Sequence, residues 1–223
     1  MLKIAHRGAS GYKLENTRTS FKEALRLKTD GVEFDVRLTK DKKIVVIHDK
    51  NLKRLTGHSG LVGSLTLKQI RKIKYKNGDN ILTLAEVFKI LNNKCVCKID
   101  LKEDGMEEKI IKFIKKRHLE KRVIITTESS SIARKIRKIS SDIKLSLGGL
   151  KKRMKAERIV RSVKNVKADI ISPHYSIISK KLIREVRKNG LLIDAYTVNK
   201  KKDIAKMKKL GVDMITTDYP DRL

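Results

Sequence analysis

The chain has few of the side chains on which nucleic-acid bases stack. It contains no tryptophan, and aromatic residues make up 4% of its 223 residues. Its formal net charge of +30, from 55 Lys and Arg against 25 Asp and Glu, would attract polyanions. The basic residues, however, are spread over nearly every expected helix and form no single block. We therefore expect solvent-facing lysines, a weak attraction to acidic membranes, and no dedicated nucleic-acid partner.

Long apolar runs and cysteine pairs are also missing. No segment approaches the length needed to cross a membrane, and the first apolar strand already begins at Leu2, without a signal peptide before it. These absences predict a cytoplasmic location. The two cysteines, Cys95 and Cys97, share one apolar strand and have no second pair elsewhere. A metal pair is one interpretation, but buried reduced thiols are the expected state.

What the chain does contain is a regular alternation of apolar strands and amphipathic helices. The expected strands cover residues 2–6, 31–36, 95–101, 123–127, 144–147, 170–172, 191–196 and 214–217. A segment rich in Gly, Lys and Asn, residues 51–80, interrupts this alternation. It predicts an inserted lobe over the site, with one short helix after Thr66.

Eight helix-linked strands predict a single α/β domain over residues 1–223, a TIM (β/α)8 barrel with parallel strands and right-handed crossovers. An open doubly wound sheet is the alternative, but the sequence has no glycine-rich dinucleotide-binding turn. Only residues 219–223 follow the last strand, so the final helix should be absent or a single turn. In such a barrel the chemistry lies at the carboxyl ends of the strands.

Two histidines enclose an acidic pair near the amino terminus. His6 and His48 each end an apolar run, and Glu33 and Asp35 lie between them at i, i+2 spacing. Alternation along a strand places the two carboxylates on one face. The connection at residues 39–43 is short enough to join only antiparallel strands. The resulting hairpin sets His48 opposite the acidic pair.

Cationic side chains and a third carboxylate are expected at the same strand ends. Arg7 directly follows His6, and its guanidinium can fork onto phosphate oxygens. Asp100 and Lys102 end the third strand, again at i, i+2 spacing. Three carboxylates suit Ca²⁺ or Mg²⁺, whereas structural zinc prefers Cys and His. A metal, two proton-transfer groups and an anion clamp predict phosphoryl transfer to water.

Two further residues are candidates for the interior of the barrel. Lys98 shares the face of Asp100, one layer deeper. A buried ammonium requires a carboxylate partner, and it would offset part of the acidic charge and weaken the metal site. His174, at the end of the sixth expected strand, is a further candidate to line the site.

At these positions the sequence resembles the glycerophosphodiester phosphodiesterase family. The similarity covers essentially the whole chain and is most specific in its first third. The matching motifs are His6-Arg7-Gly8, Glu15-Asn16-Thr17, Glu33-x-Asp35, His48-Asp49, Asp100-Leu101-Lys102, Ala195-Tyr196-Thr197-Val198-Asn199, Gly211-Val212-Asp213 and Thr217-Asp218-Tyr219-Pro220.

The resemblance implies a barrel of the phospholipase C-like phosphodiesterase type, with a small insertion after the second histidine, where residues 51–80 lie. It implies metal-dependent hydrolysis of glycerophosphodiesters, small anionic substrates, to glycerol 3-phosphate and an alcohol. It assigns acid/base catalysis to His6 and His48, and metal binding to Glu33, Asp35 and Asp100. It assigns phosphate binding to Arg7 and Lys102. Glu15 and Asn16 would order the loop near the substrate, and Tyr196 would pack against the glycerol.

The sequence departs from the family pattern at three positions. Asp100 stands where the family has Glu, which shortens that metal ligand by one methylene. Leu14 stands where the family has Pro, and Tyr196 where it has Trp. None of these changes removes an acid/base residue, so we expect activity to be retained.

Two alternatives remain open at the level of the sequence. A related phosphodiesterase could act on lysophospholipid or inositol phospholipid, for which Leu61, Val62, Leu65 and Leu67 would have to form an apolar rim. A non-enzymatic basic protein on a degenerate barrel would bind nucleic acid or acidic membrane in a salt-sensitive manner. The complete set of histidines and carboxylates argues against the second alternative.

Overall fold

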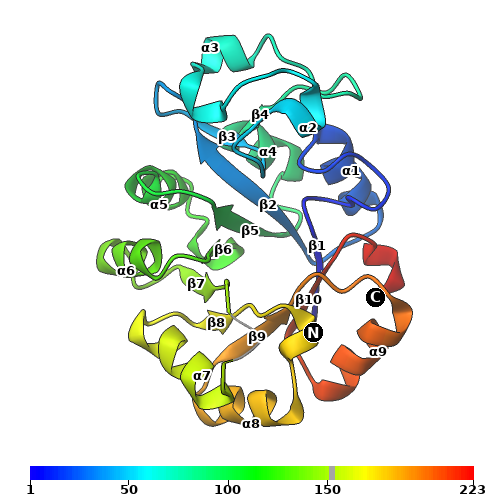
Figure 1. Ribbon diagram of the computed structural model, residues 1–223, viewed down its shortest axis with the longest axis vertical. Coiled ribbons are helices and arrows are strands. Elements are labelled where there is room, and N and C mark those ends of the chain that lie inside the picture. The colour runs from blue at the N-terminus through cyan, green and yellow to red at the C-terminus, as the bar shows by residue number, and fades with distance from the viewer. Residues whose placement is uncertain (151–153) are drawn as a thin grey trace.

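The computed structural model describes residues 1–150 and 154–223, and in these residues parallel strands close into a barrel (Figure 1). Closure follows from β1, which pairs in parallel with both β2 and β10. The predicted TIM barrel is therefore confirmed. Its strands are β1 (Leu2–Ala5), β2 (Gly31–Leu38), β5 (Val96–Leu101), β6 (Val123–Thr127), β7 (Lys144–Leu147), β8 (Ile170–Ile171), β9 (Leu192–Ala195) and β10 (Met214–Thr217).

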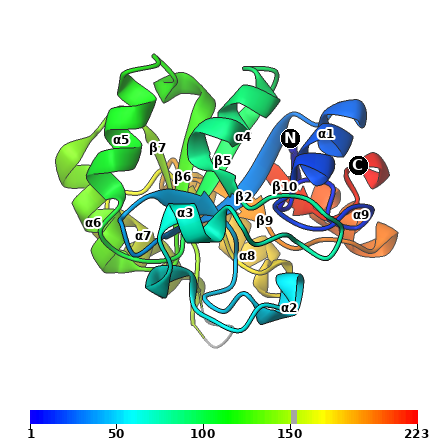
Figure 2. The ribbon, with the colours of Figure 1, turned by 90° about the horizontal axis from the view of Figure 1, so that it is seen from above.

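Amphipathic helices surround the barrel and connect successive strands (Figures 1 and 2). The capping box of Thr83 and Glu86 opens α4, as the sequence predicts. After β10 the chain forms the 3₁₀ turn Pro220–Arg222, in agreement with the single turn expected for these residues. The helices are α1 (Arg18–Arg26), α4 (Leu84–Leu91), α5 (Glu107–Lys115), α6 (Ser130–Ile139), α7 (Ala156–Asn165), α8 (Lys180–Lys188) and α9 (Lys201–Leu210).

A hairpin extends β2 beyond the barrel and leads into the inserted segment. β3 (Ile44–Val46) pairs antiparallel with β2, with Val36 opposite Val46, and β4 (Leu82–Thr83) pairs antiparallel with β3. The sequence predicts the first pair and misses β4, because two residues carry no periodicity. The antiparallel pair runs back along β2 from Leu38, so that Ile47 N–H donates to the Asp35 carbonyl oxygen at 3.0 Å and His48 follows beside the acidic pair.

The inserted segment is more structured than the sequence predicts. The expected helix after Thr66 is α3 (Leu67–Ile70), but α2 (Lys53–Thr56) and a 3₁₀ turn (Val62–Ser64) are also present. Both helices have four residues, but α3 begins after the capping residue Thr66, whereas α2 has no side-chain cap to mark its start. The segment lies to one side of the barrel (Figure 1) and packs with the hairpin in a hydrophobic cluster separate from the barrel core. That cluster consists of Val45, Ile47, Leu52, Leu55, Val62, Ile70, Tyr75 and Ile81.

Burial follows the barrel architecture. All eight residues of β2 are buried, because one face meets the helices and the other the barrel interior. Cys95 and Cys97 are buried free thiols, as expected, and burial raises the pKa of Cys95 to about 11. Within the described residues, no helix combines the length and hydrophobicity that spanning a bilayer requires.

Candidate active site

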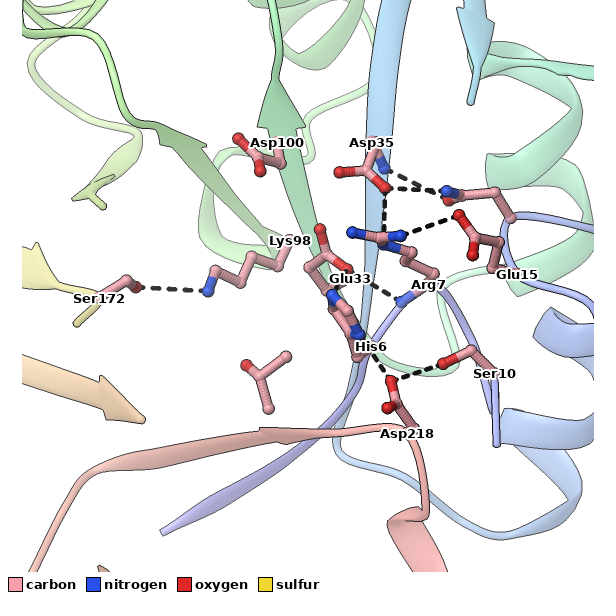
Figure 3. A network of polar contacts seen from close by, with 12 residues as sticks. His6, Arg7, Ser10, Glu15, Glu33, Asp35, Lys98, Asp100, Ser172 and Asp218 are labelled. Atoms are coloured by element: carbon pink, nitrogen blue, oxygen red, sulfur yellow. Dashed lines mark hydrogen bonds and ion pairs between the residues drawn. The ribbon is translucent and has the colours of Figure 1, made fainter. Parts of the chain in front are cut away.

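Three carboxylates meet at the carboxyl ends of β2 and β5 (Figure 3). Glu33 and Asp35 project from the same face of β2, and the parallel register places Asp100 of β5 beside Asp35. One oxygen from each of the three side chains lies within 4.8 Å of the others. All three residues are buried. The structure thus brings together the three acidic residues predicted to form the metal site.

The charge state of this triad reflects its burial and its neighbours. Burial, followed by the charge of Asp35, raises the pKa of Glu33 to about 7. Burial likewise raises the pKa of Asp100. Burial opposes ionisation of Asp35 too, but the cations of Lys102 and Arg7 outweigh it and lower its pKa. The neighbouring cations thus favour the charged form of Asp35, whereas burial disfavours the charged forms of Glu33 and Asp100, which a further positive charge would stabilise.

The donors of the triad fit a hard divalent cation. They are carboxylate oxygens only, the ligands that Mg²⁺ and Ca²⁺ prefer. Asp100 Oδ1 is buried and has no hydrogen-bond partner among the described residues. A buried carboxylate oxygen without a partner is costly, and a bound cation would satisfy it. The residues present thus fit the cation that the resemblance implies.

Two cationic side chains border the triad. Lys102 Nζ lies 2.5 Å from Asp100 Oδ2 and 3.1 Å from Asp35 Oδ1. Arg7 Nε lies 3.2 Å from Asp35 Oδ2, an ionic contact whose angles do not meet hydrogen-bond geometry. The backbone N–H of Arg7 donates to Glu33 Oε2 at 2.9 Å. Both predicted phosphate-binding residues therefore lie next to the predicted metal ligands.

His6 is held by a residue from the opposite end of the chain. Its Nδ1 lies 2.7 Å from Asp218 Oδ1, and its Nε2 lies 4.0 Å from Glu33 Oε2. Burial would lower the pKa of His6, but the hydrogen bond with Asp218 and the charge of Glu33 outweigh it, so the pKa is raised. Ser10 and Asn199 also donate to Asp218. The position of Asp218 directly after β10 was the available signal for this role.

The Asp218 contact predicts a pH dependence of stability. Burial raises and the His6 hydrogen bond lowers the pKa of Asp218, with a net value of about 2. Because the unfolded state binds this proton more readily, the stabilisation is present above about pH 4 and is lost as the pH falls toward 2. Between pH 4 and pH 2 the free energy of unfolding of the wild type should therefore fall. We expect this fall to be smaller in Asp218→Asn, by on the order of 1–2 kcal/mol. Urea unfolding of both proteins across this pH range measures the difference. The same pH dependence of the unfolding free energy in both proteins contradicts the prediction.

His48 has a similar arrangement at the end of the hairpin. Its Nδ1 lies 2.7 Å from Asp49 Oδ1, and its side chain is one-third exposed. Arg37, buried beneath it, donates from Nε to the His48 carbonyl oxygen at 2.7 Å. Asp49 also accepts from Arg54, a residue of α2 that the sequence analysis did not single out. Each predicted acid/base histidine thus has an aspartate at Nδ1.

A cavity of about 230 Å³ connects these groups. Tyr196 and Glu128 lie on the wall formed by the later strands. Glu15 does not line this cavity, and instead accepts a hydrogen bond from Arg7 at 2.8 Å. His174 is exposed and is not among the lining residues, so the structure does not support it as a site residue. The residues singled out from the sequence that line this cavity are His6, Arg7, Glu33, Asp35, His48, Lys98, Asp100, Lys102 and Tyr196.

Lys98, which lines the cavity, takes part in a buried ion pair. Lys98, on β5, pairs with Asp194 on β9, and both side chains are almost completely buried. Asp194 also accepts hydrogen bonds from Thr216 at 2.9 Å and from Ser172 at 3.1 Å. Figure 3 shows Lys98 extending away from β5 toward Ser172. Asp194 is therefore the carboxylate partner that a buried Lys98 requires.

Comparison with known proteins identifies the family of the chain. The model of the glycerophosphoryl diester phosphodiesterase family matches residues 6–222. A glycerophosphodiester phosphodiesterase of Caldanaerobacter subterraneus subsp. tengcongensis is 37% identical over 235 aligned residues, covering 100% of this chain and 96% of that protein. A glycerophosphodiester phosphodiesterase of Bacillus subtilis is 30% identical, covering 99% of this chain and 84% of that protein.

Solved structures show the same fold. The glycerophosphodiester phosphodiesterase of Thermotoga maritima superposes with a TM-score of 0.85 at 26% identity, covering 99% of this chain and 96% of that one. A phosphodiesterase of Oleispira antarctica, solved with its product sn-glycerol-3-phosphate, superposes with a TM-score of 0.85 at 23% identity, covering 98% of this chain and 93% of that one. With the family match over residues 6–222, these similarities show that the chain belongs to the glycerophosphoryl diester phosphodiesterase family.

Proposed function

We propose that this protein hydrolyses glycerophosphodiesters to glycerol 3-phosphate and an alcohol. The observation that carries the proposal is one cavity lined by two imidazoles, three clustered carboxylates and the cationic side chains of Arg7 and Lys102. Relatives that match over the full chain are named for this activity, and the Oleispira antarctica phosphodiesterase was solved with sn-glycerol-3-phosphate. An anionic substrate suits the cations that line the cavity.

In the proposed mechanism, Arg7 and Lys102 bind the phosphate oxygens and stabilise the charge of the transition state. One histidine accepts the proton of the nucleophile, which is either water or the neighbouring glycerol hydroxyl. The other histidine donates a proton to the leaving alcohol oxygen. Asp218 and Asp49 occupy Nδ1 of His6 and His48, which leaves Nε2 of each ring for proton transfer.

Glu33, Asp35 and Asp100 would hold a divalent cation, Mg²⁺ or Ca²⁺. When bound, it would supply further positive charge for the phosphodiester. Lys102 and Arg7 already contact this triad and keep part of its charge compensated. Tyr196, partly buried on the opposite wall of the cavity, is proposed to pack against the glycerol.

The inserted lobe offers little apolar surface for an acyl chain. Val62 is buried, and Leu65 and Leu67 pack against the core of the lobe. Leu61 alone of the four residues considered for an apolar rim is an exposed large hydrophobic residue. These contacts favour the small deacylated substrate over lysophospholipid. A cytoplasmic location and a weak attraction to acidic membranes stay predictions from the sequence.

Release of glycerol 3-phosphate tests the proposed function and its metal dependence together. We expect release from glycerophosphocholine and related diesters, loss of activity of a hundredfold or more with chelator, and recovery on adding Mg²⁺ or Ca²⁺. Lysophosphatidylcholine should be a poor substrate. Asp100→Asn should weaken cation binding in calorimetry, whereas Asp104→Asn, at an exposed ion pair, should not.

Two results would contradict parts of this proposal. Absence of glycerol 3-phosphate from every diester rejects the activity. Undiminished turnover by metal-free protein rejects the role of the cation, while leaving the two histidines and the phosphate-binding cations in place.

A further inference from the structure

Arg54, in the inserted lobe, contacts two acidic side chains that belong to different parts of the site. Its Nε donates to Asp49 Oδ2 at 2.5 Å. Its Nη1 and Nη2 donate to Glu15 Oε2 and Oε1 at 2.9 and 2.8 Å. This bidentate contact with one carboxylate and a third bond to another uses the planar fork of the guanidinium.

Each of these carboxylates also holds a group that lines the cavity. Asp49 uses its other oxygen to contact His48 Nδ1 at 2.7 Å. Glu15 accepts from Arg7 Nη1 at 2.8 Å. A continuous chain of hydrogen bonds thus connects two groups that line the cavity. It runs from His48 through Asp49, Arg54 and Glu15 to Arg7.

The electrostatics favour the fully charged form of this chain. Hydrogen bonding to Arg54 lowers the pKa of Asp49 to about 2. Burial opposes ionisation of Glu15, but its bonds to Arg54 and Arg7 outweigh it and lower its pKa. Both carboxylates are therefore ionised at neutral pH, and each accepts strong, charge-assisted hydrogen bonds from both sides.

The local fold explains how Arg54 reaches both partners. It lies in α2, a single helical turn that ends at Gly57 with φ of 77°. Its neighbours Leu52 and Leu55 are buried in the hydrophobic cluster of the lobe. These two anchors fix the turn against the hairpin that carries His48, so the guanidinium lies between Asp49 and Glu15.

We propose that Arg54 is a positioning residue that aligns His48 and Arg7 together, so that the inserted lobe takes part in the reaction. The inference rests on the proposed function. Without Arg54, Asp49 loses the hydrogen bond that fixes its carboxylate beside His48. Glu15 loses two of its three side-chain hydrogen bonds within the described residues and keeps the one from Arg7. Misplacement of an acid/base group lowers kcat, and misplacement of Arg7 weakens phosphate binding.

The test compares Arg54→Ala and Arg54→Lys with the control Arg71→Ala. Arg71 also belongs to the inserted lobe and donates to one surface carboxylate, Glu86, at 2.9 Å. We expect Arg54→Ala to lower kcat roughly 10–100-fold and to raise KM several-fold. Arg54→Lys should recover only part of this loss, because one ammonium cannot span both carboxylates. Arg71→Ala should stay within about twofold of the wild type.

Two further measurements separate positioning from a merely structural role. Guanidinium ion added to Arg54→Ala should restore part of kcat, and should have no effect on Arg71→Ala. Combining Arg54→Ala with Asp49→Asn or Glu15→Gln should give less than the sum of the single effects, because the residues act as one unit. If Arg54→Ala is too unstable to assay, Arg54→Lys replaces it in the kinetic comparison and in the double variants.

The outcomes distinguish this inference from the proposed function. Unchanged kcat in Arg54→Ala, or strictly additive double variants, overturns the positioning role while the activity stands. If the wild type cleaves no glycerophosphodiester, the proposed function fails by itself. Calorimetry with inorganic phosphate then tests whether Arg54 positions Arg7. Phosphate should bind more weakly to Arg54→Ala than to Arg71→Ala, and equal affinities overturn this part of the inference.

Discussion

Replacing His48 or His6 with alanine is expected to lower kcat for glycerophosphodiester cleavage by roughly a hundredfold or more. Each ring lines the cavity that contains the carboxylate triad, and each has an aspartate at Nδ1. Loss of either ring removes one of the two proton transfers that the reaction requires. The triad, Arg7 and Lys102 remain, so the affinity for phosphate should fall much less than kcat.

The leaving group can identify which histidine donates the proton. A diester of glycerol 3-phosphate with p-nitrophenol releases an alcohol that needs no proton. The variant that lacks the general acid should recover much of its rate on this substrate, and the variant that lacks the general base should not. His58→Ala is the control, because His58 is exposed and lies outside the cavity lining. Full turnover by either His6→Ala or His48→Ala refutes the acid/base assignment.

Asp194→Ala is expected to destabilise the protein by about 3–5 kcal/mol. The side chain of Asp194 is completely buried and that of Lys98 is 4% exposed, so the substitution leaves an ammonium in the barrel without its carboxylate. It also removes the acceptor for the hydroxyls of Thr216 and Ser172. A buried charge without a partner is among the most costly single changes in a protein core.

Urea unfolding of purified variants measures this effect. The double variant Lys98→Met/Asp194→Leu removes both charges and should recover a large part of the loss. Glu157→Gln, at an ion pair on the surface, should leave the free energy of unfolding nearly unchanged. If Asp194→Ala unfolds at the same urea concentration as the wild type, the pair contributes nothing to stability. The effect of Lys98 on cation affinity can be measured in the same variants.

Local rules were sufficient to predict much of the barrel and the grouping of the acidic residues. Alternation along β2 places Glu33 and Asp35 on one face whatever the rest of the chain does. The short connection after β2 permits only an antiparallel return, which brings His48 to the same strand end. The periodic helices and the count of strands indicated the barrel. The two-residue strand β4 and the four-residue helix α2 were missed because neither is long enough to repeat its period, and α2 has no side-chain cap that marks its start.

The partners of these residues depended on the tertiary structure. Asp218 reaches His6 because β10 closes the barrel against β1, across a sequence separation of 212 residues. Asp194 meets Lys98 across the barrel, between β9 and β5. A strand's own sequence determines which face a side chain occupies, and this was enough to select the histidines and carboxylates. Which side chain lies opposite depends on strand register and barrel closure, and these arise only when segments distant in sequence pack together.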